Sequence, residues 1–244
     1  MLEVSDLRKS FGALRASDGI SLEIREGETH AIIGPNGAGK TTFIAQLAGN
    51  LRPDSGAIRF AGEDVTRMPT HQRARRGLAR SFQITSVFLD FTALRNVALA
   101  VQAHERRVGF WRDARKDPAL NERARQCLRD VGLDGRFDVP AVNLSHGEHR
   151  QLEMAMALAT RPRLLLLDEP MAGMGADESQ RMIGLLSRLK GSHTIVLVEH
   201  DMDAVFRLAD RISVLVYGRL IATDTPERIR ANEEVRRAYL GEDL

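Results

Sequence analysis

Short apolar runs alternate along the chain with longer stretches in which apolar residues recur every three or four positions. In residues 20–24, apolar and polar side chains alternate, which predicts a strand with one buried face. Residues 164–167 and 194–198 are almost entirely apolar, as expected of parallel strands that are covered on both faces. The pattern predicts strands at residues 2–11, 20–24, 31–33, 58–60, 164–167, 194–198 and 212–216.

Helical spacing of apolar residues separates these strands. The i, i+3, i+4, i+7 pattern of a helix with one buried face occurs at Leu152, Ala155, Met156 and Ala159. Repeated strand–helix–strand order favours a parallel sheet wound by right-handed crossovers, whereas the strands before residue 61 include antiparallel ones. The prediction is an α/β fold with helices after residue 42, around 94–101, and at 148–159, 177–190, 201–209 and from 225 onward.

Composition narrows the class of protein only a little. The chain has 244 residues, of which 43% are hydrophobic and 28% charged, as in an ordinary soluble protein. A net charge of +2 gives no electrostatic argument for nucleic-acid binding. The single cysteine, Cys127, excludes an internal disulfide and a multi-cysteine metal site. We expect neither a signal peptide nor a membrane span, so a membrane role would need spans from another chain.

A glycine-rich segment follows the strand at residues 31–33. Residues 32–42 are IIGPNGAGKTT and fit G-x-x-x-x-G-K-[ST], the phosphate-binding P-loop or Walker A motif. Its glycines let backbone N–H groups surround an anion, Lys40 would reach the terminal phosphates, and the Thr41 hydroxyl would hold Mg²⁺. The alternative is a chance glycine-rich turn. The predicted nucleotide-binding residues are Gly34, Pro35, Asn36, Gly37, Ala38, Gly39, Lys40, Thr41 and Thr42.

Polar residues also follow two later apolar strands. Asp168 and Glu169 end one strand, and His200 comes shortly after the next. Since ligands of open α/β sheets bind beyond the carboxyl ends of the strands, we expect these side chains beside the P-loop. Asp168 would hold Mg²⁺, Glu169 would orient or deprotonate the attacking water, and His200 would contact the γ-phosphate. The alternatives are two acids that cap a helix and a structural histidine.

Two other segments invite a functional interpretation. Residues 68–80 carry several arginines, and the simpler interpretation is a solvated helix face. Residues 82 to about 139 are charged and helical in composition, and we interpret them as a helical lobe inserted in the α/β core. Within them, Phe110 and Trp111 could contact a partner or a membrane surface, or could pack inside the lobe.

Together these motifs resemble the ATP-binding subunits of ABC transporters over nearly the whole chain. The order and spacing of the motifs are those of the family. The segments that carry the resemblance are GPNGAGKTT (34–42), Gln83, LSHGE (144–148), LLLLDEP (164–170) and His200.

The resemblance implies further site residues. Phe11 would stack on adenine, and Gln83 would be a ligand of Mg²⁺ and water that senses the transporter. LSHGE would be the signature motif, whose Ser145 and Gly147 bind the γ-phosphate of ATP held by the opposite subunit. The family therefore implies a head-to-tail dimer around two ATP molecules, each with Mg²⁺.

A closer resemblance is to the ATPases of branched-chain amino acid uptake systems. It implies integral-membrane permease partners, a second ATPase subunit that is identical or related, and an indirect link to a periplasmic substrate-binding protein. The expected location is peripheral, on the cytoplasmic face of the bacterial inner membrane. The residues that carry it are RSFQ (80–83), LSHGEHRQLEMAMALA (144–159), DEPMAGMG (168–175), VEHDMDAVFRLADRISVL (198–215) and RANEEVRRAYLGE (230–242).

The resemblance also implies a division of the chain. Residues 1–82 and 140–224 would form a P-loop ATPase core with a parallel sheet and an N-terminal antiparallel part. Residues 83–139 would form the helical lobe, and residues 225–244 a helical tail. A groove for the membrane partner would lie between Gln83 and the lobe, lined by residues 84–97.

Three positions depart from the family pattern. His146 stands where glycine is commonest, Glu148 where glutamine is commonest, and Gly175 where the D-loop usually has aspartate. Because Glu169 is intact, we predict hydrolysis. The alternatives are an export ATPase of the lipopolysaccharide type and a soluble ATPase acting on DNA or ribosomes. The second is disfavoured by the single P-loop, the lack of sustained heptads and the balanced charge.

Overall fold

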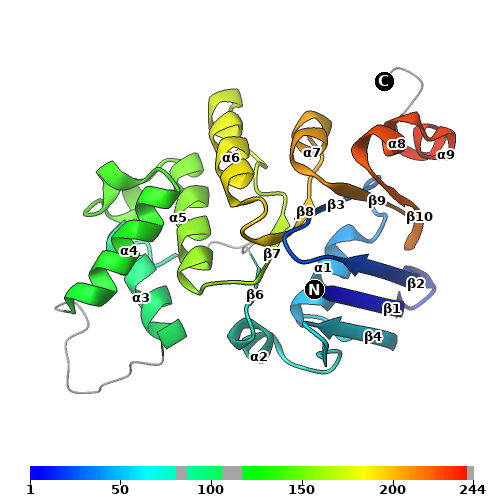
Figure 1. The fold of residues 1–244 in the computed structure, drawn as a ribbon, viewed down its shortest axis with the longest axis horizontal. Helices are drawn as coiled ribbons and strands as arrows, with labels where there is room; N and C mark the ends of the chain where they lie inside the picture. The colour runs from blue at the N-terminus through cyan, green and yellow to red at the C-terminus, as the bar shows by residue number, and fades with distance from the viewer. Residues whose placement is uncertain (81–86, 106–116, 241–244) are drawn as a thin grey trace.

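The computed structural model describes residues 1–80, 87–105 and 117–240, which form two β-sheets and the helices that cover them (Figure 1). The strands are β1 (Leu2–Phe11), β2 (Leu14–Ile24), β3 (Thr29–Ile33), β4 (Ser55–Phe60), β5 (Glu63–Asp64), β6 (Leu78–Arg80), β7 (Leu164–Asp168), β8 (Thr194–Val198), β9 (Arg211–Val216) and β10 (Arg219–Asp224). The α-helices are α1 (Lys40–Ala48), α2 (Thr70–Arg75), α3 (Ala93–Glu105), α4 (Pro118–Asp130), α5 (His146–Ala159), α6 (Ala176–Leu189), α7 (Met202–Leu208), α8 (Pro226–Ala231) and α9 (Glu233–Val235).

The larger sheet has the strand order β10-β9-β3-β8-β7-β6, and every neighbouring pair is parallel except β10 with β9. Its central strands are buried on both faces, which explains their unbroken apolar sequences. In β7, Leu164 and Leu166 pack on the side of α1, whereas Leu165 and Leu167 pack on the side of α3–α6. The predicted parallel sheet is thus confirmed, with one antiparallel edge strand added.

The smaller sheet is antiparallel, with the order β2-β1-β4-β5. Its inward residues, such as Leu2, Ile20 and Ile58, share a buried cluster with Phe43 and Leu47 of α1. Helix α1 is therefore held between the two sheets, and its N-terminus, where the P-loop ends, is fixed from both sides.

Helices α3, α4 and α5 pack on one another through buried residues such as Val97, Ala124, Leu128 and Leu152. They lie at the end of the molecule away from β1 and β2, on the left of Figure 1. Asp117 accepts hydrogen bonds from Ala119 N and Leu120 N, so α4 begins with a side-chain cap followed by proline. Thus α5, which carries the LSHGE motif at its start, is part of this helical group.

The predicted α/β fold class is confirmed, with local differences. Strand β2 begins at Leu14 rather than Ile20, and β5, β6 and β10 were not predicted. Phe110 and Trp111 lie outside the described residues. Within the described ranges, no helix combines the length and the apolarity needed to cross a bilayer.

Arg73 is the exception to the interpretation of the arginine-rich segment as a solvated face, since Arg75 and Arg76 are exposed. Its side chain is 1% exposed, and its guanidinium donates to carbonyl oxygens at 2.6–3.1 Å. Burial lowers the pKa of Arg73 to about 10, although Asp64 opposes the effect. Arg73 therefore joins the C-terminal end of α1 to the segment before α2. The acceptors are the carbonyl groups of Gln46, Leu47, Thr66 and Met68.

Candidate nucleotide-binding and hydrolysis site

The P-loop connects β3 to α1 in a conformation that requires glycine. Gly37 and Gly39 have φ angles of +78° and +106°, in the left-handed region. A Cβ atom at Gly39 would clash with the carbonyl oxygen of Ala16 on β2, so no larger residue fits there. The loop is thus wrapped tightly before α1, with backbone N–H groups at a helix N-terminus, as an anion site requires.

Lys40 is the first residue of α1 and is buried against this loop. Its Nζ donates to the carbonyl oxygens of Gly34 (2.6 Å) and Pro35 (3.0 Å). Burial lowers the pKa of Lys40, while the nearby charges of Glu169 and Asp168 oppose this effect. The lysine therefore lies between the P-loop and the two acids at the end of β7.

The strand ends meet at one level of the sheet, as predicted. Asp168 is paired with Val198, and Val198 is paired with Ile32, the residue two positions before the P-loop glycine Gly34. Neighbouring strands lie about 4.8 Å apart, so Asp168 and the P-loop are separated by little more than one strand, β8. The sheet topology alone brings the buried acid and the phosphate-binding loop together.

Asp168 is fully buried and has two unlike oxygens. Its Oδ2 accepts from Arg80 Nη2 at 3.0 Å, whereas its Oδ1 has no hydrogen-bond partner among the described residues. Burial raises the pKa of Asp168, and the positive charge of Arg80 partly offsets this. A buried carboxylate oxygen without a donor is chemically suited to a hard cation such as Mg²⁺.

Glu169 and His200 lie together at the opening of the site. His200 Nε2 lies 2.9 Å from Glu169 Oε1, and both side chains are partly exposed. Glu169 has a φ of +51°, a strained value that occurs often at functional positions. Its backbone N–H donates to Val198 O, which fixes the turn after β7 against β8.

A third acid, Glu199, supports this turn and was not singled out from the sequence. Its carboxylate accepts from the backbone N–H groups of Met171 (2.9 Å) and His200 (3.0 Å). Burial raises the pKa of Glu199, although these hydrogen bonds oppose the shift. It thereby links the segments that carry Glu169 and His200. An acid directly after an apolar strand was its only sequence signal.

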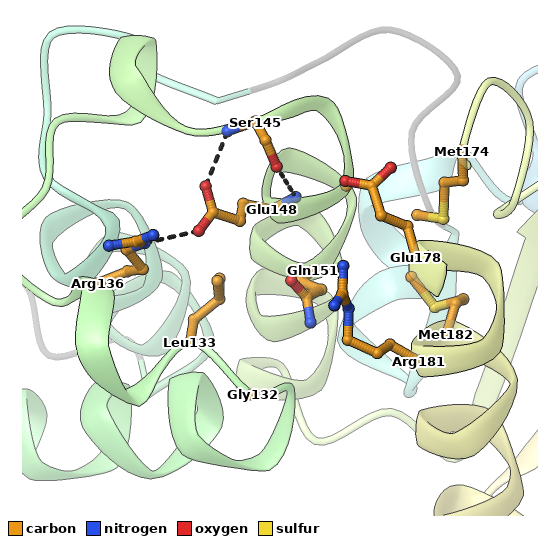
Figure 2. A pocket seen from close by; sticks show the side chains of 11 residues that line it. Gly132, Leu133, Arg136, Ser145, Glu148, Gln151, Met174, Glu178, Arg181 and Met182 are labelled. Atoms are coloured by element: carbon orange, nitrogen blue, oxygen red, sulfur yellow. Dashed lines mark hydrogen bonds and ion pairs between the residues drawn. The ribbon is translucent and has the colours of Figure 1, made fainter. Parts of the chain in front are cut away.

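The LSHGE motif forms the N-terminus of α5 (Figure 2). The Ser145 hydroxyl accepts from Glu148 N, and the Glu148 carboxylate accepts from Ser145 N, which completes a capping box. Arg136 donates to the same carboxylate at 2.6 Å. A cavity of about 410 Å³ opens beside Ser145 and Gly147, and a Cβ atom at Gly147 would require the Glu178 side chain of α6 to move.

His146, which stands where the family pattern most often has glycine, makes a specific contact. Its Nε2 donates to the carbonyl oxygen of Ala172 at 3.2 Å, and its ring lies against Gly173. Ala172 N in turn donates to Glu169 O, so the LSHGE motif is joined to the turn that carries Glu169.

The structure brings together the P-loop, Asp168, Glu169 and His200, but other candidates lie apart. Ser145 and Gly147 share no hydrogen bond or ion pair with the P-loop among the described residues. Phe11, at the end of β1, is 50% exposed, with Lys9 above its ring. Gln83 lies outside the described residues.

A glycine-rich loop at a helix N-terminus, a buried acid at the adjoining strand end and an exposed Glu–His pair define a P-loop ATPase. The chain belongs to the ABC transporter family. The family model for the ABC transporter matches residues 17–172, and the model described as branched-chain amino acid ATP-binding cassette transporter matches residues 219–244. The chain is therefore a nucleotide-binding ATPase, which confirms the predicted family and the predicted enzyme class.

Relatives cover the whole chain. The high-affinity branched-chain amino acid transport ATP-binding protein BraF of Pseudomonas aeruginosa is 39% identical over 99% of this chain and 98% of its own length. The corresponding LivG protein of Escherichia coli is 38% identical with the same coverage. The ADP conformation of MJ1267, an ATP-binding cassette of an ABC transporter, superposes with a TM-score of 0.86 at 28% identity, covering 99% of both chains.

Proposed function

We propose that this chain hydrolyses ATP to drive an importer of branched-chain amino acids or chemically related amino acids and amides. The observation that carries the ATPase part is the convergence of Lys40, Asp168, Glu169 and His200 on one edge of the sheet. The substrate class follows from the relatives BraF and LivG and from the match at residues 219–244.

In the proposed site, the P-loop backbone and Lys40 hold the ATP phosphates. Thr41, Gln83 and Asp168 hold Mg²⁺, directly or through water. Two observations fit this role: Asp168 Oδ1 has no hydrogen-bond partner among the described residues, and Thr41 is exposed at the start of α1. When bound, Mg²⁺ neutralises charge that develops on the phosphates.

Hydrolysis is assigned to the Glu–His pair. Glu169 orients and deprotonates the attacking water, and its exposure at the strand end leaves room for that water. His200 holds the Glu169 carboxylate by its hydrogen bond and contacts the γ-phosphate. Phe11 stacks on the adenine ring, for which its exposed position is suitable.

The separation of Ser145 and Gly147 from the P-loop supports a site shared between two subunits. The N-terminus of α5 presents N–H groups that suit the γ-phosphate of ATP held by a second copy or a related ATPase. We propose a head-to-tail dimer with two ATP molecules at its interface.

The division of the chain follows the same scheme. We propose residues 1–82 and 140–224 as the ATPase core, 83–139 as the helical lobe and 225–244 as the tail, with α5 completing the helical group.

Exposed apolar side chains at Phe88, Leu89 and Val142 lie together, because Val142 N donates to Leu89 O. This patch suits an integral-membrane permease, which would place the chain peripherally at the cytoplasmic face of the inner membrane.

The test is uptake of radiolabelled leucine, isoleucine and valine by a deletion strain that carries the parent gene or the Lys40→Ala variant. Restored uptake with the parent gene alone supports the proposal. Full uptake without the gene would rule out the substrate class, and ATPase activity that persists in Lys40→Ala would rule out the assigned P-loop. Co-purification with export components or with ribosomes would instead indicate the alternative systems.

A further inference from the structure

Arg80 stands at a junction that the ATPase assignment does not use. It is the last residue of β6, the edge strand that pairs in parallel with β7, and Arg80 is opposite Leu166. Arg80 therefore lies beside the strand that ends in Asp168, one of the proposed Mg²⁺ ligands.

The Arg80 guanidinium bridges to Asp168 across the sheet. Its Nη2 donates to Asp168 Oδ2 at 3.0 Å, and its Nη1 lies 3.4 Å from Asn50 Oδ1, just after α1. The Arg80 side chain is 16% exposed, and that of Asp168 is 0% exposed. A carboxylate so deeply buried needs a cation or donors, and Arg80 is the only described side chain that hydrogen-bonds to it.

The two carboxylate oxygens of Asp168 therefore differ in their hydrogen-bond partners. Oδ2 is used by the protein, while Oδ1 has no partner in the described part of the chain. A guanidinium is planar and always charged, so it holds Oδ2 in one direction and thereby fixes where Oδ1 points. Residues that hold a metal ligand in this way contribute strongly to metal affinity without touching the metal.

We propose that Arg80 is a positioning residue for the Mg²⁺ site: it holds Asp168 through Oδ2 so that Oδ1 faces the cation. This inference depends on the proposed Mg²⁺ role of Asp168. A purely structural ion pair would instead affect folding alone and leave the Mg²⁺ dependence of nucleotide binding unchanged.

The experiment titrates Mg²⁺ against a fluorescent ADP analogue bound to the full chain, with a parallel titration of the analogue in EDTA. We expect Arg80→Met to weaken Mg²⁺ binding at least about tenfold, the range seen for residues that support metal ligands. Affinity for the analogue in EDTA should change less than about twofold, because Arg80 does not line the P-loop. Arg76→Met is the matched control, since Arg76 forms an exposed pair with Glu63.

Arg80→Lys is the second variant, because it keeps a positive charge beside buried Asp168 and so preserves folding. A lysine lacks the planar fork, so Mg²⁺ binding should still weaken by a factor of about three or more. If both variants bind Mg²⁺ like the parent, the Arg80 inference is wrong and the site assignment stands. If the parent itself shows no Mg²⁺-dependent gain in binding, the proposed role of Asp168 fails, and the inference fails with it.

Discussion

His200 Nε2 donates to Glu169 Oε1 across 2.9 Å, although the two residues follow different strands. The backbones of β7 and β8 hold the pair, and Glu199 beneath them accepts from His200 N. Because both side chains remain partly exposed, the carboxylate is oriented but accessible to water. A general base requires this combination, since it must have a fixed direction and a free oxygen toward its substrate.

Glu169→Gln should therefore abolish hydrolysis while leaving ATP binding intact. The loss of a general base typically lowers kcat by about 10²- to 10⁴-fold, and glutamine keeps the shape of the side chain. Phosphate release measures the rate, and size-exclusion chromatography with ATP should show a trapped dimer. Glu63→Gln, at an exposed acid away from the strand ends, should behave like the parent. Hydrolysis by Glu169→Gln at the parent rate would remove the general-base assignment.

His200→Ala should lower kcat by about 10²-fold with little change in KM, because a misplaced base costs about this much. His200→Gln keeps a side-chain donor and should recover part of the rate. His71→Ala, at an exposed histidine of α2, is the control. Steady-state kinetics over a range of ATP concentrations separates the two constants. A change in KM alone would mean that His200 binds the nucleotide but does not position Glu169.

His146 links the LSHGE motif to the turn of Glu169 through Ala172 O. In a head-to-tail dimer these two features would serve different ATP molecules. His146→Gly should then lower the Hill coefficient for ATP toward one and reduce the rate by a factor of about two to ten, the value of one hydrogen bond. His146→Gln retains a donor and should stay closer to the parent. An unchanged Hill coefficient in His146→Gly would show that the contact carries no coupling.

The sequence predicted the elements that depend on local patterns. It did not predict the contacts that depend on how distant strands pair. Apolar runs predicted β7 and β8, an alternating pattern predicted β9, and the P-loop motif marked the end of β3. Strand β6 has only three residues and ends in arginine, so its pattern is too short to recognise. Arg80 and Asp168 are 88 positions apart, and only the register of β6 with β7 brings them together.

The arginine-rich segment shows the same limit. A charge run indicates a solvated face, but it does not reveal which arginine turns inward. Arg73 is buried because carbonyl groups at the end of α1 accept hydrogen bonds from its guanidinium, and those groups belong to residues far away in the sequence. The position of Asp168 and Glu169 near the P-loop was predictable, by contrast, because parallel strands place their carboxyl ends at one edge.

Arg73→Met should destabilise the fold by roughly 3–5 kcal/mol, because it leaves buried carbonyl groups without a donor. Arg75→Met, on the exposed side of the same helix, should change stability by less than about 0.5 kcal/mol. Urea unfolding monitored by circular dichroism measures both. Equal stability of the two variants would mean that water replaces the guanidinium without cost. The loss of stability in Arg73→Met should also affect the nucleotide-binding site, because Arg73 holds the helix that begins at Lys40.

Glu28 gives a pH-dependent prediction. It lies directly before β3 and two residues before His30, and its Oε1 accepts from His30 Nδ1 at 2.7 Å, while Oε2 accepts from Arg25 N. Burial, the largest single influence, would raise the pKa of Glu28, but these hydrogen bonds and the charge of Arg211 together lower it below its ordinary value of 4.5. The ionised carboxylate therefore stabilises the folded state above pH 4.5, and this contribution is lost as pH falls through the lowered folded pKa.

Glu28→Gln should therefore reduce the free energy of unfolding at neutral pH by about 1–3 kcal/mol, the usual value of hydrogen bonds to a charged group. The difference from the parent should shrink as the pH falls below 4.5, where the parent carboxylate becomes protonated. Urea unfolding at neutral pH and at about pH 3.5 measures both values under matched salt. Glu26→Gln, at an exposed neighbour whose contact with Arg163 is 3.5 Å long, is the control and should show no such trend. A difference for Glu28→Gln that stays constant with pH would show that the charge on this carboxylate does not stabilise the strand beneath the P-loop.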